Sequence, residues 1–258
     1  LWLESERLMH AKIDMEGVET QREVVKEERK LRLENQPYGS ILSETFSHAY
    51  TEHPYQWTPI GDDQYIDQAS LEEFMDFYNT YYVPNNAVLS IAGDIDIEET
   101  KKLVKAYFGP IKKGTKEMNR PDIKEPKQTS ETIDTVYDNI QLPAVVQSYH
   151  IPERGSDDFY AIQMVTKLLS DGKSSRLYKR MVDEEKSALN VATMPFELED
   201  PGLFLTFSIA NMGVEAEALQ EAMDEEIEKV QEELISERSC RNSKIRWKTS
   251  LFLKMHPL

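Results

Sequence analysis

The chain has 258 residues and a mass of 29.9 kDa, and 40% of its residues are hydrophobic, which is enough for one large domain or two of ordinary size. Its net charge of −17 repels nucleic-acid phosphates and anionic lipid headgroups, so neither class of partner is expected. The longest apolar stretches, 87–92 and 203–210, are far shorter than the roughly 18 residues of a membrane-spanning helix, so membrane insertion is not expected either. Cys240 is the single cysteine, which excludes an internal disulfide and a thiolate metal cage.

Apolar periodicity, interrupted by Pro and Gly, divides the first part of the chain into elements. Helices are predicted at 1–9, 19–35, 40–50 and 95–108, and a further helix follows its N-cap Ser70. Apolar residues at helical spacing in that further helix are predicted to face the core: Leu71, Phe74, Phe77 and Tyr78. Residues 51–67 are predicted to be an irregular loop, and residues 87–92 a buried strand.

The segment 112–128 is rich in Lys, Pro, Glu and Thr, and it has too little apolar content to order itself well. It is therefore predicted to be a linker between two domains. Beyond it, strands are predicted at 129–138, 144–151, 188–196 and 202–210, and helices at 157–169, 174–185 and 214–236. The last of these helices carries one apolar stripe: Leu219, Met223, Ile227, Val230 and Leu234.

Histidine and carboxylate ligands for zinc are the obvious candidates for chemistry, because the sequence contains no G-x-G-x-x-G, P-loop or G-x-S-x-G motif. Neither H-x-x-E-H nor H-E-x-x-H occurs. His48 and His53 are five residues apart, which places their side chains roughly 140° apart around a helix. We therefore interpret both as ordinary loop or surface residues.

Glu28 lies in the middle of an apolar helix face, because Val24, Val25 and Leu31 are four, three and three residues away from it. A carboxylate in such a place needs a cation, a hydrogen-bond network or a metal. The sequence leaves two interpretations open. In the first, Glu28 has a structural role: it forms an ion pair with an arginine such as Arg22 or Arg32, or it reaches solvent at the edge of the face. In the second, Glu28 binds a metal ion.

Three long motifs resemble those of one peptidase family: L-W-L-E-S-E-R-L, Q-R-E-V-V-K-E-E-R-K-L-R-L-E-N-Q-P-Y-G and F-Y-N-T-Y-Y-V-P-N-N-A-V-L-S-I-A-G-D-I-D. The likeness continues at 107–111, 168–178 and 201–204, and it covers essentially residues 1–238. On these motifs the chain is similar to the insulinase-type zinc peptidases, which include pitrilysin and mitochondrial processing peptidase.

The resemblance implies an α+β fold of paired homologous domains, each an antiparallel sheet with helices packed on one face, that close around an extended peptide. Residues 1–111 would be the C-terminal half of the first, metal-bearing domain, and 129–238 would be the second domain, also incomplete. In that family an H-x-x-E-H motif binds zinc and activates water, and a distal glutamate is the third ligand. Matching Q-R-E-V-V-K-E-E to the distal motif places this ligand on Glu28.

The H-x-x-E-H motif is expected some tens of residues before Leu1, which begins inside a helical pattern. The resemblance therefore implies a fragment of a zinc metalloendopeptidase that contains no catalytic residue and is inactive by itself. A second family glutamate corresponds here to Gln21, which puts the support of the zinc in doubt. The substrate-binding Arg and Tyr of the family correspond to Val182 and Leu189, which cannot donate hydrogen bonds from their side chains.

These departures imply that a second family subunit or a fused C-terminal half completes the peptidase and that peptides are its substrates. The alternative is a non-catalytic scaffold or partner subunit of the same family. The family resemblance favours the bacterial periplasm or cell envelope as the compartment. Exposed apolar helices, and hence self-association, are also expected of a fragment.

The last 20 residues, 239–258, carry five basic residues and no acid, whereas residues 1–238 have a net charge of −22. A family-like helix can be written in codons that encode residues 238–257 when one G is deleted. This tail is therefore predicted to be aberrant, by a frameshift near Ser239. In that case Cys240, Trp247 and His256 have no functional history.

Overall fold

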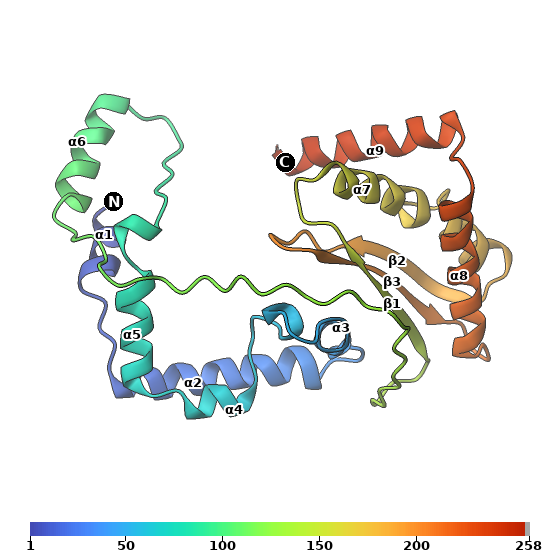
Figure 1. Cartoon of the computed structure of the whole chain (residues 1–258), viewed down its shortest axis with the longest axis horizontal. Helices are drawn as coiled ribbons and strands as arrows, with labels where there is room; N and C mark the ends of the chain where they lie inside the picture. Colours follow the sequence, from blue (N-terminus) through green and yellow to red (C-terminus); the bar gives the residue numbers. More distant parts are fainter. Residues whose placement is uncertain (256–258) are drawn as a thin grey trace. The chain divides into compact units, whose positions relative to one another are not determined.

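The computed structural model describes the backbone of residues 1–255 and the side chains of residues 1–245 and 247 (Figure 1). The contacts within the chain define two compact units. The first unit comprises residues 1–36 and 57–125, and the second comprises residues 37–56 and 126 onward. No helix within residues 1–255 combines the length and apolar character needed to cross a bilayer.

The first unit is helical, and residues 1–36 and 57–125 contain no β-strand. Its elements are α1 (Trp2–Met9), α2 (Met15–Arg29), the π-helical turn η1 (Lys30–Glu34), α4 (Asp63–Gln68), α5 (Leu71–Tyr81), the 3₁₀ turn η3 (Pro84–Asn86) and α6 (Ile97–Phe108). Four of these helices begin at a side chain that accepts a backbone N–H, which satisfies one of the free donors of the first turn: Asp14, Asp62, Ser70 and Asp96.

Three predictions for the first unit are wrong. Residues 87–92 form no strand, and Val88 is 97% exposed, because no neighbouring strand satisfies their backbone or covers their side chains. Phe74 and Phe77 of α5 are exposed rather than core, since the helix packs against no sheet. The predicted loop 51–67 contains most of α4, which Asp62 caps.

The second unit contains a three-stranded antiparallel sheet in the order β1-β3-β2. Its elements are α3 (Ile41–Ala49), the 3₁₀ turn η2 (Pro54–Gln56), β1 (Ala144–Ile151), α7 (Asp157–Ser170), the π-helical η4 (Tyr178–Glu184), β2 (Ala188–Pro195), β3 (Gly202–Ala210), α8 (Ala216–Glu232) and α9 (Glu237–Met255). The combination of this sheet with helices is the expected α+β architecture.

Alternation along β3 sends its side chains to two different cores. Phe204 joins a cluster with buried side chains of α7, η4 and α8, including Leu169, Met181 and Leu219. Leu203 and Leu205 face the opposite way, toward the aromatic side chains of α3. Helices α7 and α8 and the π-helical η4 therefore cover one face of the sheet, as expected, and α3 adds cover on the other face.

The segment 37–56, which the sequence placed in the first domain, packs in the second unit. Tyr50 is 1% exposed, and its hydroxyl donates to the carbonyl of Pro201 at 2.9 Å. The Tyr38 hydroxyl donates to the carbonyl of Leu142 at 2.7 Å. Contacts with the apolar face of β3, together with these two hydrogen bonds, therefore hold the segment in the second unit.

Two further predictions concern the ends of the second unit. Residues 129–138 form no strand, and Tyr137 is 91% exposed, because no strand lies beside them. The basic tail forms α9, which lies along α7 (Figure 1). Its Trp247 Nε1 donates to Gln163 Oε1 at 2.6 Å. His256 lies outside the described residues.

Candidate metal-ligand face of helix α2

Helix α2 has one polar face that holds α4. Arg22 Nε donates to the carbonyl of Ile66 at 2.9 Å, and Lys26 Nζ lies 3.0 Å from Asp67 Oδ1. The Arg22 side chain is only 13% exposed, and burial at this contact fixes it on the α4 side of the helix. This face is therefore structural.

The other face of α2 carries Gln21, Val24 and Glu28 at helical spacing, and Leu31 of the following η1 continues it. Apolar residues flank Glu28 on this face, as predicted, but the face is not buried. Val24 is 53% exposed, Leu31 is 58% exposed, and the Glu28 side chain is 42% exposed. The Glu28 carboxylate is therefore partly solvated and does not carry the free-energy cost of a buried carboxylate that the sequence pattern predicted.

Glu28 has an arginine partner on its own helix. Its Oε1 lies 2.6 Å from an Arg32 guanidinium nitrogen, one turn away. The ion pair is one of the alternatives that the sequence left open, and Arg32 rather than Arg22 provides it. Because the Arg32 side chain is 70% exposed, the pair is solvated and Arg32 can turn away from Glu28 at little cost.

The Glu28 side chain is a single carboxylate, which cannot form a metal site alone. Within residues 1–255 no group of three His, Cys, Asp or Glu side chains is close enough to hold a metal ion. A carboxylate oxygen is a chemically suitable zinc ligand, and this carboxylate lies on an open helix face. The chain therefore fits zinc through one side chain and provides no complete site.

His48 and His53 lie in the second unit and contact acidic side chains rather than each other. His48 Nε2 is 3.1 Å from Asp134, and His53 Nε2 is 3.4 Å from Asp200, so the two imidazoles turn to different partners. His53 is 7% exposed. It lies in the loop before η2, as one of the two predicted alternatives, but it is not at the surface, because aromatic rings pack around it, among them Tyr55 with ring centroids 4.2 Å away.

Val182 and Leu189, which the family resemblance predicted to stand at the positions of a substrate-binding Arg and Tyr, have unlike surroundings. Val182 packs against the core cluster of the second unit. Leu189 is 54% exposed on β2. Neither side chain carries a hydrogen-bond donor, so neither can bind a peptide backbone in that way.

Comparison with known proteins assigns this chain to a family. Residues 68–245 match the family described as the peptidase M16 inactive domain. The chain belongs to the peptidase M16 family. The insulinase-type resemblance drawn from the sequence is thereby confirmed, and the matched M16 domain is one that its description calls inactive.

The M16 chain is 34% identical to the zinc protease PqqE of Helicobacter pylori over 230 residues. The matched region covers 88% of this chain and 52% of PqqE. A crystal structure of a protease from Helicobacter pylori matches 96% of this chain and 60% of that chain, with a TM-score of 0.89 and 31% identity. The periplasmic protease PqqL of Escherichia coli shares the fold, with a TM-score of 0.69 and 17% identity over 98% of this chain and 29% of that chain. This chain thus spans about half the length of the curated relative PqqE.

Proposed function

We propose that this M16 chain is part of a zinc metalloendopeptidase that hydrolyses extended peptides, and that it contributes the carboxylate of Glu28 to the metal site. The position of Glu28 carries the proposal, because it lies in the middle of a helix face whose apolar residues Val24 and Leu31 are more than half exposed. Zinc in such a site lowers the pKa of a bound water so that the water can attack a peptide carbonyl.

The other ligands would come from a longer polypeptide or from a second subunit, because the described residues contain no set of three. Several relatives of this chain are named zinc proteases, and the family match supports the same metal here. The 258-residue chain on its own is expected to hydrolyse no peptide. A homologous partner subunit or a fused second half is therefore part of the proposal.

The test uses a gene product that also carries an H-x-x-E-H motif, purified as wild type, as Glu28→Gln and as Glu27→Gln. Glu27 is a matched control, because it is the adjacent carboxylate, is 65% exposed and pairs with Lys30 at 3.2 Å. We expect about one zinc per wild-type molecule by mass spectrometry after dialysis. Loss of a ligand in Glu28→Gln should weaken zinc binding at least about tenfold, whereas Glu27→Gln should retain the metal. Undiminished zinc in Glu28→Gln would overturn the assignment.

A non-catalytic scaffold of the same family is the second candidate. It is favoured by Gln21, Val182 and Leu189, which lack the groups that the catalytic members use, and by the inactive-domain description of the match. A wild-type product that contains no zinc and co-purifies with an active family member would establish this alternative.

For the compartment we propose the bacterial periplasm or cell envelope. The support is the shared fold with a protein named as a periplasmic protease. Fractionation of cells that express the native gene, followed by detection with an antibody, would locate the protein. Recovery in the cytoplasmic fraction alone would contradict the proposal.

We also propose two domains, at 1–111 and 129–238. The linker 112–128 joins them, and an aberrant tail follows the second. The boundary between the compact units at 125/126 lies inside the proposed linker. The family match continues to residue 245, some residues past the proposed frameshift near Ser239. Sequencing the gene decides the tail, because a frameshift requires an alternative reading frame that continues the family-like helix.

A further inference from the structure

The first unit contains a hollow of about 530 Å³ where the ends of α1 and α5 meet the segment 110–116. The sequence does not reveal this hollow, because residues 112–128 have the composition of a linker without structure of its own. The only local signal is three lysines around a glycine, at 112, 113 and 116. The hollow is open to solvent and lies wholly inside the first unit.

The lysine segment is fixed in place by the turn that follows α5. Asn85 Oδ1 accepts from the Gly114 N–H at 2.6 Å, and Asn85 Nδ2 donates to the Gly114 carbonyl at 3.4 Å. A Cβ at Gly114 would come within 2.8 Å of a Val83 methyl carbon, so a glycine is needed for this close approach. Long-range contacts therefore hold Lys112 and Lys113 beside the hollow.

The hollow carries positive charge in an otherwise acidic chain. No Asp or Glu lines it. Two of its basic side chains have acidic partners nearby, since Lys116 pairs with Asp76 and His10 Nδ1 lies 2.7 Å from Glu6. In the part of the chain that the structure describes, Lys112 and Lys113 form no ion pair, so their charges are available to a ligand.

Lysines near helix C-termini often serve only to complement the helix dipole. Here one carbonyl in the last turn of each helix already has a side-chain donor. The carbonyl of Arg7 accepts from the Tyr78 hydroxyl, and the carbonyl of Tyr81 accepts from Asn86 Nδ2 at 3.0 Å. These two carbonyls therefore do not need the lysines as donors.

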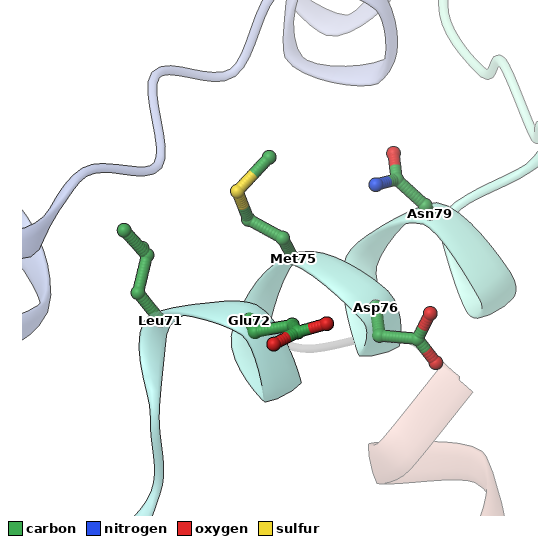
Figure 2. A pocket seen from close by; sticks show the side chains of 5 residues that line it. All are labelled: Leu71, Glu72, Met75, Asp76 and Asn79. Carbon is green, nitrogen blue, oxygen red and sulfur yellow. The ribbon is translucent and has the colours of Figure 1, made fainter.

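The wall opposite the lysines is aromatic and amide in character. The rings of Tyr78 and Tyr82 stack with centroids 5.3 Å apart, and Tyr82 is 54% exposed. Burial raises the pKa of the Tyr78 hydroxyl above its ordinary value. Asn79 lines both this hollow and a neighbouring one on α5, and Figure 2 shows its amide extending from the helix beyond Met75.

We propose that this hollow, the Lys112–Lys113 pocket, binds an acidic peptide segment. The two ammonium groups would bind side-chain carboxylates, the Asn79 amide would bind a peptide backbone group, and the tyrosine rings would contact apolar atoms. A peptide fits better than an inorganic anion, because the open hollow offers apolar and aromatic surface along with charge. The proposal does not depend on zinc or on Glu28.

The test measures the binding of a fluorescein-labelled hexaglutamate peptide to the 258-residue chain by anisotropy at low ionic strength. We expect the double substitution Lys112→Gln, Lys113→Gln to weaken binding at least about fivefold, since it removes both free cations. The control Lys102→Gln, Lys105→Gln removes the same charge from the exposed surface of α6 and should leave binding within about twofold of wild type. Equal losses in both variants would overturn the pocket in favour of bulk charge, and so would absence of binding to wild type.

Two further variants separate the pocket from charge alone. Asn79→Ala keeps every charge and should weaken the peptide about threefold or more if the amide contacts it. Gly114→Ala should move the lysine segment, with a similar loss. Competition by inorganic phosphate at the same charge concentration should be weak. Displacement of the peptide by phosphate with equal efficiency, together with unchanged binding in Asn79→Ala, would contradict a peptide site.

Discussion

The two units of this chain keep their helices by different means. In the second unit, twelve buried residues form one cluster between the sheet and its helices. In the first unit, Val18 and Val83 are the buried apolar residues of the described sequence, although its helices carry many large apolar side chains. The comparison shows that amphipathic helices become a core only where a sheet or another helix covers their apolar faces.

Local interactions are correspondingly denser at the helix ends of the first unit. Its helices α2, α4, α5 and α6 all begin at a side chain that accepts a backbone N–H. Among the α-helices of residues 1–36 and 57–125, only α1 lacks such a cap. In the second unit, Ser156 caps α7, whereas α3 and α8 begin without a side-chain cap and are stabilised by tertiary burial. The helices of the first unit are therefore stabilised mainly by local interactions, whereas those of the second unit are stabilised mainly by tertiary packing.

The largest expected difference between the units is the unfolding free energy lost when a leucine is replaced by alanine. Leu219 on α8 is 0% exposed, so Leu219→Ala should cost about 3 kcal/mol of unfolding free energy, through lost burial and a cavity. Leu103 on α6 is 42% exposed, and Leu103→Ala should cost less than about 1 kcal/mol. Urea unfolding, with hydrogen exchange to assign each transition to its unit, measures both. Equal costs would show that the first unit has a core of its own under solution conditions.

The cap of α5 gives a smaller and pH-dependent effect in the first unit. The Ser70 N–H donates to Glu73 Oε2 at 2.7 Å, and this bond, together with the Ser70 hydroxyl, lowers the pKa of Glu73 below its ordinary 4.5. A lowered folded-state pKa stabilises the helix above pH 4.5, and the contribution is lost as the pH falls through the lowered value. The proton shift of the Ser70 amide should therefore titrate below pH 4.5.

Glu73→Gln is the matched variant for this titration, because it keeps the side chain's shape and removes its charge. Its Ser70 amide shift should be flat over the same range. A Ser70 shift that titrates at or above pH 4.5 would mean that the capping box does not form in solution.

The same contrast explains which sequence-based predictions succeeded. The apolar stripe of α8 places Leu219 and Met223 in the core, because periodicity fixes the face and the sheet is present to cover it. Leu234 belongs to the same pattern but is fully exposed, since the helix ends at Glu232. Val88 was predicted to be buried from composition alone, but burial requires a partner strand that composition does not reveal.

The site predictions follow this rule as well. Periodicity located Glu28 on the apolar face of α2, but not its exposure, which depends on what packs there. Local composition read residues 112–128 as disordered, because the contact that orders Gly114 comes from Asn85, far away in the sequence. Patterns within one helix are visible in a sequence, whereas contacts between distant segments are visible only in a structure.

The smallest stability effect is expected at Glu28, and its smallness is informative. Because the Glu28 and Arg32 side chains are 42% and 70% exposed, their i, i+4 ion pair should contribute less than about 0.5 kcal/mol, and Glu28→Gln should unfold at nearly the same urea concentration as wild type. Arg22→Gln on the opposite face removes two bonds to carbonyls of Ile66 and Ala69 and should cost more, about 1 kcal/mol or above.

A Glu28 that is dispensable for stability has no structural reason to be a glutamate in this chain. Loss of zinc in Glu28→Gln of the longer protein, at unchanged stability, would then report ligation rather than unfolding. If Glu28→Gln instead destabilises this chain by 1 kcal/mol or more, the carboxylate has a structural partner besides Arg32, and the open face of α2 is not available to a metal.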